Sequence, residues 1–223
     1  MTFAISIACA ALLAGQDLSL ATILIEGEGW KPAPKAGVES RLGPQLVAGG
    51  PMGASYAIVG KAPARSLEHR APGKPAKAVT VVGLVDPSCL ALSADRGTLV
   101  VGDAGGKHLW LFRVNADGTL DAADRCATMR LRPGQTASGV IAVSVDSGGR
   151  IFACLPGEIH AFDPTARASG VIFGPPGGPV DAFFTSGEGL YVRQKGEVMG
   201  RMIQPFPKPM LKLPARPDAR RAS

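Results

Sequence analysis

The sequence predicts an all-β protein, built as a β-propeller of four-stranded blades. A unit of short apolar runs separated by polar turns recurs roughly every 40 to 50 residues, which is the period of propeller blades. The runs are rich in Val, Ile, Leu and Phe and are bounded by Gly, Asp and Pro, as strands are. Glycine (29) and proline (19) are frequent, as expected where many turns join short elements.

Three copies of this unit are clear. Each begins with an apolar run, a polar turn that contains glycine, and a second apolar run, at residues 89–103, 141–155 and 180–194. A third apolar run follows each copy, at 107–114, 157–164 and 196–203. An isolated blade cannot bury both faces of its sheet, so repeats of this kind require neighbouring blades packed on either side.

Further runs complete the pattern. Segments 124–131 and 168–174 are expected to form the fourth, outermost strands of two blades, and a weaker upstream copy spans 43–60 and continues in 66–73. The turn "NADG" at 115–118 has glycine where a hairpin needs a positive φ. At the usual blade length the chain has room for about four blades.

The ends of the chain differ from the repeats. Residues 1–22 contain an apolar core of about a dozen residues before Gln16, which suits a signal peptide and is too short to span a membrane. A buried N-terminal helix or strand is the alternative. We therefore expect export to the periplasm or the extracellular space, and a cytoplasmic location otherwise. Residues 23–42 would lead into blades at 43–205, and 206–223 would form a basic, proline-rich tail.

The net charge of +6 comes largely from two stretches, 61–77 and 206–223. No nucleic-acid-binding motif accompanies these basic residues, and aromatic residues make up only 5% of the chain. We interpret the basic stretches as solvated surface and expect no nucleic-acid partner. The sequence leaves the oligomeric state open.

The four cysteines are Cys9, Cys89, Cys126 and Cys154. No two of them have the spacing of a CxxC motif, and Cys89 and Cys154 fall inside apolar runs. Buried thiols are therefore expected rather than a disulfide framework.

Several of these segments are similar to one known family. The stretch "LALSADRGTLVVGDAGGKHLWLFRVNADGTL" (90–120) resembles a blade of the senescence marker protein/gluconolactonase/regucalcin-like family. Residues 143–164 resemble its following blade and 187–198 the one after. The likeness covers 85–203 and extends less closely to 23–32.

The resemblance implies a six-bladed β-propeller with a divalent cation, calcium or zinc, in its central channel. It also implies a small-molecule partner, a sugar lactone that is hydrolysed. In such a mechanism the metal polarises the carbonyl and acidifies bound water while a carboxylate moves the proton. With about four blades, this chain would be a divergent or truncated member with a partial ring.

The metal ligands that the resemblance implies do not match this sequence. They are a Glu before Gly-Pro, an Asn before Gly and an Asp before Gly. Here Leu42 precedes Gly43-Pro44, and the second position reads Ser88-Cys89. The third reads Ser138-Gly139 or Ile141-Ala142, depending on where an insertion is placed. Hydroxyl and apolar side chains are poor substitutes for carboxylates at a calcium site, so no metal ligand is assigned.

Four polar residues remain as candidates for the channel mouth. Asp86 and Ser88 come at the start of one inner strand, and Ser138 and Asp181 hold comparable places in the following repeats. They could form a residual polar or cation-binding mouth, or they could cap turns. No catalytic residue follows from the sequence.

Three functions remain open on this basis. The first is the lactone hydrolase that the resemblance implies. The second is a non-catalytic propeller that binds a small molecule, a sugar or a protein. The third is an inactive, truncated family member.

Other polar residues are expected to be structural. Asp103 and Asp163 follow strand-like runs, where aspartate commonly forms turns. His69, His108 and His160 have no metal-ligand spacing among themselves.

Overall fold

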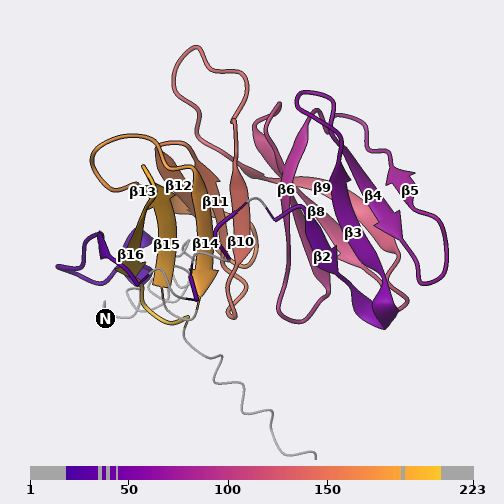
Figure 1. Cartoon of the computed structure of the whole chain (residues 1–223), viewed down its shortest axis with the longest axis horizontal. Helices are drawn as coiled ribbons and strands as arrows, with labels where there is room; N and C mark the ends of the chain where they lie inside the picture. Colours follow the sequence, from indigo (N-terminus) through magenta and orange to yellow (C-terminus); the bar gives the residue numbers. More distant parts are fainter. Residues whose placement is uncertain (1–18, 35–36, 39–40, 44, 187–188, 207–223) are drawn as a thin grey trace, which may run out of the picture.

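The part of the chain that the structure describes forms four antiparallel sheets of four strands each (Figure 1). The structure is a computed structural model that describes residues 19–34, 37–38, 41–43, 45–186 and 189–206. These residues include no α-helix, and short 3-10 turns lie at Leu20–Thr22 and Pro51–Gly53. The predicted all-β propeller of four-stranded blades is confirmed.

Each sheet is one blade, named here in chain order. Blade 1 consists of β2 (Val47–Gly49), β3 (Ser55–Val59), β4 (Ser66–Arg70) and β5 (Lys77–Val79). Blade 2 consists of β6 (Pro87–Leu92), β7 (Thr98–Asp103), β8 (His108–Val114) and β9 (Leu120–Thr128). Blade 3 consists of β10 (Ala142–Val145), β11 (Ile151–Leu155), β12 (Glu158–Phe162) and β13 (Ala168–Phe173). Blade 4 consists of β14 (Ala182–Ser186), β15 (Gly189–Gln194), β16 (Glu197–Met202) and β1 (Lys31–Pro32).

The strands in the middle of blades 2 and 3 are buried on both faces, because a neighbouring blade covers each side. All five residues of β11 are buried, and β6 is buried along almost its whole length. This explains why the repeats read as continuous apolar runs rather than as an alternation of apolar and polar residues.

The turn at 115–118 behaves as predicted, since Gly118 has a φ of +83° and a side chain there would collide with Ala54.

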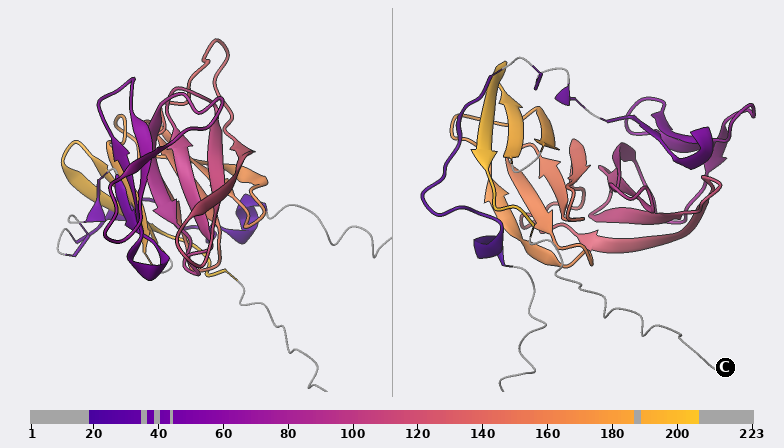
Figure 2. Two further views of the ribbon diagram at one scale, coloured as in Figure 1. Left: turned by 90° about the vertical axis from the view of Figure 1, so that its right-hand side faces the viewer. Right: turned by 90° about the horizontal axis from the view of Figure 1, so that it is seen from below.

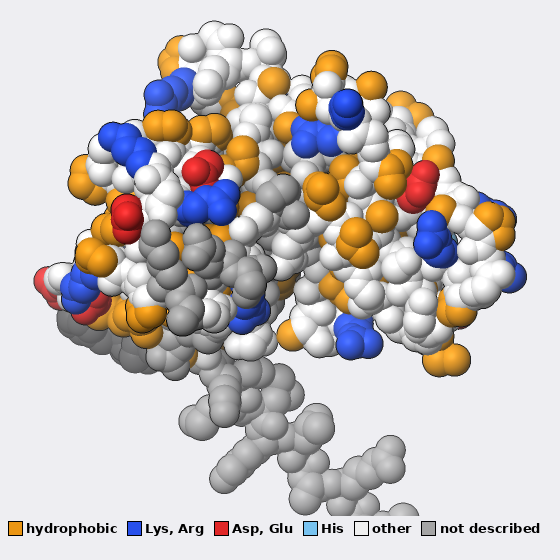
Figure 3. All heavy atoms as spheres, in the orientation of Figure 1, with side chains coloured by type: hydrophobic (Ala, Val, Ile, Leu, Met, Phe, Trp, Pro, Cys, Tyr) orange, Lys and Arg blue, Asp and Glu red, His pale blue; other side chains and the backbone are white. Residues whose placement is uncertain are grey.

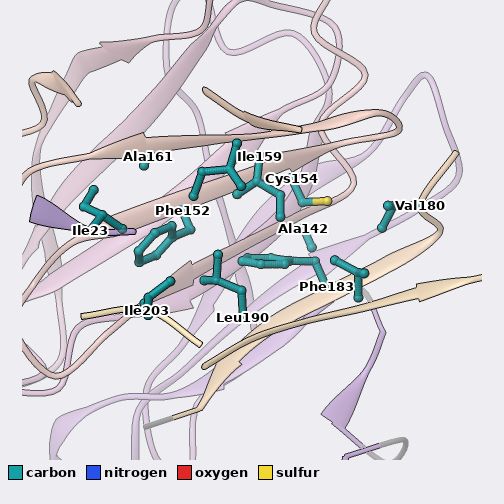
Figure 4. Close-up of a cluster of buried hydrophobic side chains, with 12 residues drawn as sticks. Ile23, Ala142, Phe152, Cys154, Ile159, Ala161, Val180, Phe183, Leu190 and Ile203 are labelled. Atoms are coloured by element: carbon teal, nitrogen blue, oxygen red, sulfur yellow. The ribbon is translucent and has the colours of Figure 1, made fainter. Parts of the chain in front are cut away.

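The hydrophobic core consists of the layers between successive blades. Tyr56 and Leu67 of blade 1 cluster with Leu90 and Trp110 of blade 2. A second cluster joins blades 2 and 3, and a third joins blades 3 and 4 around Phe152 and neighbouring side chains (Figure 4). The inner strands contact one another in the order β2, β6, β10, β14. Blades 1 and 4 therefore lie at the two ends of an arc (Figure 2).

Blade 4 is completed by a strand from the beginning of the chain. Lys31 pairs with Gly200 and Pro32 with Met199, so β1 is the outermost strand beside β16. The expected lead-in segment is thus part of the last blade. This blade had no predicted fourth strand, because its partner lies far away in the sequence.

The segment after β1 also covers the free face of blade 4. Leu42 is 7% exposed and packs with Ala182, Phe184 and Val198. The Arg41 guanidinium lies 4.8 Å from the centre of the Phe184 ring. The apolar end face of blade 4 is therefore partly covered by the chain itself.

The predicted repeats agree with the strands, with small shifts. The weak upstream copy is blade 1. The outer strand expected at 124–131 is β9, which begins at Leu120 and ends at Thr128, because hydrogen-bonding to β8 extends it toward the 115–118 turn.

Some expectations fall outside the described residues. These are most of the expected signal peptide, Cys9, and the tail from 207 onward. The buried state of Cys89 and Cys154 is confirmed, whereas Cys126 is exposed, and all three are free thiols. Within the part of the chain that the structure describes, no helix has the length and apolar character needed to cross a membrane. On the face shown in Figure 3, Lys and Arg side chains are dispersed rather than gathered in one patch.

Candidate channel-mouth site

Asp86 lies immediately before the inner strand of blade 2 and is 5% exposed. Arg65, in the loop between β3 and β4 of blade 1, donates to both of its carboxylate oxygens, with Nε–Oδ1 at 2.8 Å and Nη2–Oδ2 at 2.6 Å. Such a two-pronged pair is among the strongest hydrogen-bonding arrangements of an arginine. These hydrogen bonds lower the pKa of Asp86, so its carboxylate is charged at neutral pH. Both of its oxygens already accept hydrogen bonds from Arg65.

Asp103, at the end of β7, holds the loop that carries Asp86. Its carboxylate accepts hydrogen bonds from four backbone N–H groups, those of Val85, Asp86, Gly105 and Gly106. The expected turn-forming role of Asp103 is confirmed by these contacts. Asp103 is 1% exposed, so its carboxylate fixes the position of Asp86 rather than facing a ligand.

The two serine candidates tie blade 2 to blade 3. The Ser88 hydroxyl donates to the Val140 carbonyl at 2.7 Å, and the Ser138 hydroxyl donates to the Asp103 carbonyl at 2.8 Å. Both residues are buried. The backbone N–H of Ser138 also donates to the carbonyl of Gly106 at 2.8 Å. Both hydroxyl protons are thus used within the protein.

Asp181 precedes the inner strand of blade 4 and lies apart from the other three. Its Oδ1 accepts a 2.6 Å hydrogen bond from Nε of Arg193, on the adjacent strand of the same blade. The Asp181 side chain is 53% exposed. The structure therefore joins Asp86, Ser88 and Ser138 through blades 1 to 3, and places Asp181 in a separate, solvated pair.

The four candidates do not fit a divalent cation. Calcium needs six to eight oxygen ligands, including free carboxylates. Here both carboxylates hold an arginine, and both serine hydroxyls donate to backbone carbonyls. Nowhere in the described ranges do three His, Cys, Asp or Glu side chains gather closely enough to hold a metal ion.

The two buried thiols and two of the histidines make contacts within the protein. Burial raises the pKa of Cys89 to about 12 and also raises that of Cys154, so neither is a nucleophile at neutral pH. His160 is 2% exposed and contacts Glu158 through Nε2 at 3.1 Å. His108 contacts the Thr128 hydroxyl at 3.1 Å.

The described residues also form cavities away from these four candidates, and two of them are large enough to consider as ligand sites. One, of about 330 Å³, lies between blades 2 and 3 beyond the far ends of their inner strands. The other, of about 430 Å³, lies beside blade 1 and includes His69, Lys74 and Lys77. None of the four channel-mouth candidates lines either cavity.

Sequence reasoning missed the two arginines. Arg65 lies in the basic stretch that was interpreted as solvated surface, and no local pattern marks its contact with the next blade. The contact of Arg193 with Asp181 could have been predicted from the β14–β15 hairpin, which pairs Arg193 with Ala182, the residue after Asp181.

Comparisons with known proteins agree with this architecture. The chain is 28% identical over 125 residues to a gluconolactonase of Zymomonas mobilis subsp. mobilis, a match that covers 52% of this chain and 35% of that protein. No family model matches. The chain is a β-propeller that is similar in sequence to a gluconolactonase.

Solved structures support the same fold for this chain. A gluconolactonase from Xanthomonas campestris superposes with a TM-score of 0.51 at 19% identity, over 68% of this chain and 54% of that one. Regucalcin, a calcium-binding protein from Agrobacterium tumefaciens, gives 0.55 at 17% identity, over 72% and 61%. A luciferin-regenerating enzyme gives 0.56 at 14% identity, over 72% and 62%. The chain thus spans less than two thirds of the length of these relatives, and at such identities the likeness concerns the fold.

Proposed function

We propose that this gluconolactonase-like propeller binds a small, sugar-like ligand and does not carry out metal-dependent lactone hydrolysis. The observation that carries the proposal is the Arg65–Asp86 pair. The one buried carboxylate among the channel-mouth candidates holds a guanidinium from the neighbouring blade at 2.6 and 2.8 Å. A cation at this carboxylate would have to displace a buried, two-pronged ion pair, which is energetically costly.

The remaining candidates support the same conclusion. The hydroxyls of Ser88 and Ser138 donate to backbone carbonyls that belong to neighbouring blades, so the site is built to hold blades together. The small-ligand part of the proposal rests on the similarity to a gluconolactonase and on a cavity between two blades.

Hydrolysis of several sugar lactones by the purified chain tests the proposal. The assay is run with calcium, with zinc, and then with a chelator, and the gluconolactonase of Zymomonas mobilis serves as the positive control. We expect a rate equal to that of buffer in all three conditions. Turnover that is saturable and lost on chelation would overturn the proposal.

The second candidate function is lactone hydrolysis itself, favoured by the 28% identity to a gluconolactonase. If the assay shows turnover, the variant Arg65→Ala discriminates between sites. A mechanism at Asp86 would change its metal dependence, because the variant leaves that carboxylate without its guanidinium. Unchanged metal dependence would place the chemistry elsewhere on the molecule.

A further inference from the structure

The cavity of about 330 Å³ between blades 2 and 3 has the features of a small-molecule site. It is framed by the β6–β7 turn of blade 2, the β10–β11 turn of blade 3 and the turn that follows β12. The channel-mouth candidates lie at the beginning of the inner strands, whereas this cavity lies beyond their ends. The six residues of β6 separate the two places by roughly 20 Å.

The floor of the cavity is aliphatic. Val100 and Leu111 contribute from blade 2, and Val145 and Ile151 from blade 3. Val100 and Ile151 belong to the core between these blades, with Leu111 and Val145 packed against it, so the floor is rigid. An apolar floor of this kind suits the C–H face of a sugar ring, whose burial is favourable.

The rim of the cavity is polar and held in place. In the blade 2 turn, Oδ1 of Asp95 accepts hydrogen bonds from the Ser93 hydroxyl and from the Gly97 N–H. Those bonds fix the carboxylate and use one of its oxygens. In the blade 3 turn, the carboxylate of Asp146 is held by Arg150, with Nε–Oδ2 at 2.6 Å. Fixed acceptors cost little conformational entropy when a ligand binds.

The two carboxylates on the rim differ in charge balance. Asp146 is neutralised by Arg150, whose guanidinium also lies against the Phe152 and Phe206 rings. Asp95 has hydroxyl and backbone N–H partners, and these hydrogen bonds lower its pKa, so it is charged at neutral pH. The rim therefore presents a net negative charge, which favours hydroxyl donors and repels acidic ligands.

We propose that this cavity between blades 2 and 3 binds a neutral, polyhydroxylated ligand, with the sugar ring on the aliphatic floor and its hydroxyls donating to Asp95. The site takes a neutral sugar or sugar lactone in preference to the corresponding sugar acid. This inference rests on the proposed small-ligand function and gives it a location and a charge preference.

The test uses the whole chain and two stable probes, methyl β-glucoside and gluconate. Backbone amide signals of 93–98 and 146–149 are followed by NMR during titration at millimolar concentrations. We expect saturable shifts with the glucoside, and binding of gluconate at least about tenfold weaker, which corresponds to one good polar contact. No saturable shift of these signals with the glucoside, or equal binding of both probes, would overturn the proposal.

A variant and its matched control locate the site, and a third variant tests its charge preference. Ala94→Trp places a large ring at an exposed position that lines the cavity. Ala116→Trp, at an exposed position in the β8–β9 turn, is its matched control. We expect loss of glucoside binding in the first variant only. Asp95→Asn keeps an acceptor but removes the charge, so it should bring the affinities for the two probes together.

The outcomes distinguish this inference from the proposed function. If the glucoside still binds to Ala94→Trp, the cavity between blades 2 and 3 is not the binding site, but the protein still binds a small ligand as proposed. Lactone hydrolysis that is lost on chelation would contradict the proposed function, whatever this cavity binds. If Ala94→Trp fails to fold, as judged by its thermal unfolding, the affinity ratio in Asp95→Asn decides.

Discussion

Asp86 and Asp181 occupy comparable places before the inner strands of blades 2 and 4, and each accepts a 2.6 Å hydrogen bond from an arginine. Their surroundings differ. Asp86 is buried and its arginine comes from the preceding blade, whereas Asp181 is half exposed and its arginine comes from its own blade. The first ion pair links two blades, and the second is a partly exposed ion pair within a single blade.

The difference follows from the loops of the preceding blades. In blade 1 the chain between β3 and β4 has six residues, 60–65, which is long enough to carry Arg65 across to blade 2. In blade 3 the corresponding turn between β11 and β12 has two residues, Pro156 and Gly157. It offers only the Pro156 carbonyl, which accepts from the N–H of Val180. The same aspartate in the repeat thus acquires its role from the length of a neighbouring loop.

The largest expected effect comes from breaking the blade 1–2 pair. Arg65→Ala leaves a buried carboxylate without its partner, which should lower the free energy of unfolding by about 3 kcal/mol. Urea unfolding followed by tryptophan fluorescence measures it, because Trp110 lies in the core between these blades. A loss below about 1 kcal/mol, the usual limit for exposed pairs, would show that the pair does not tie the blades together.

The pH dependence of stability sharpens the same contrast. Arg65 lowers the pKa of Asp86 below its ordinary value of 3.8, so the folded carboxyl releases its proton more readily than the unfolded one. The stabilisation is therefore fully present above the unfolded value and is lost as the pH falls through the lower folded value.

Acid titration of the unfolding free energy measures this effect. Wild-type protein should lose stability more steeply than Asp86→Asn as the pH falls below the ordinary aspartate pKa of 3.8. Arg65→Ala should flatten the curve in the same way, because it removes the cause of the shift. Identical slopes in all three proteins would contradict the assigned role of the pair.

The contrast also shows which parts of the molecule a sequence can specify. The blades were predictable because their strands are encoded locally, by apolar runs and by turn residues such as Gly118 with its positive φ. The strand β1 was not, because two residues without a period carry no strand signal and their partners, Met199 and Gly200, lie at the other end of the chain. The completion of blade 4 by a strand from the beginning of the chain is a property of the assembled fold.

The candidate site divides in the same way. Aspartates and serines at the beginning of inner strands could be found from the repeat, and three of them do come together through the contacts of blades 1 to 3. Their occupation by Arg65 and by backbone carbonyls could not be found, because it depends on loops that meet only in three dimensions. Residue type predicted polarity at the mouth, and tertiary contacts decide whether that polarity is available to a ligand.

The smallest expected effect comes from the blade 4 pair. Arg193→Ala removes a partner that is 32% exposed from a carboxylate that is 53% exposed, so water can replace the lost contact. We expect the free energy of unfolding to change by less than about 0.5 kcal/mol, in the range of solvated ion pairs. The measurement is the same urea titration, with Arg65→Ala alongside. A change as large as that of Arg65→Ala would mean that exposure does not distinguish the two pairs, and that blade 4 depends on its own arginine as blade 2 depends on its neighbour's.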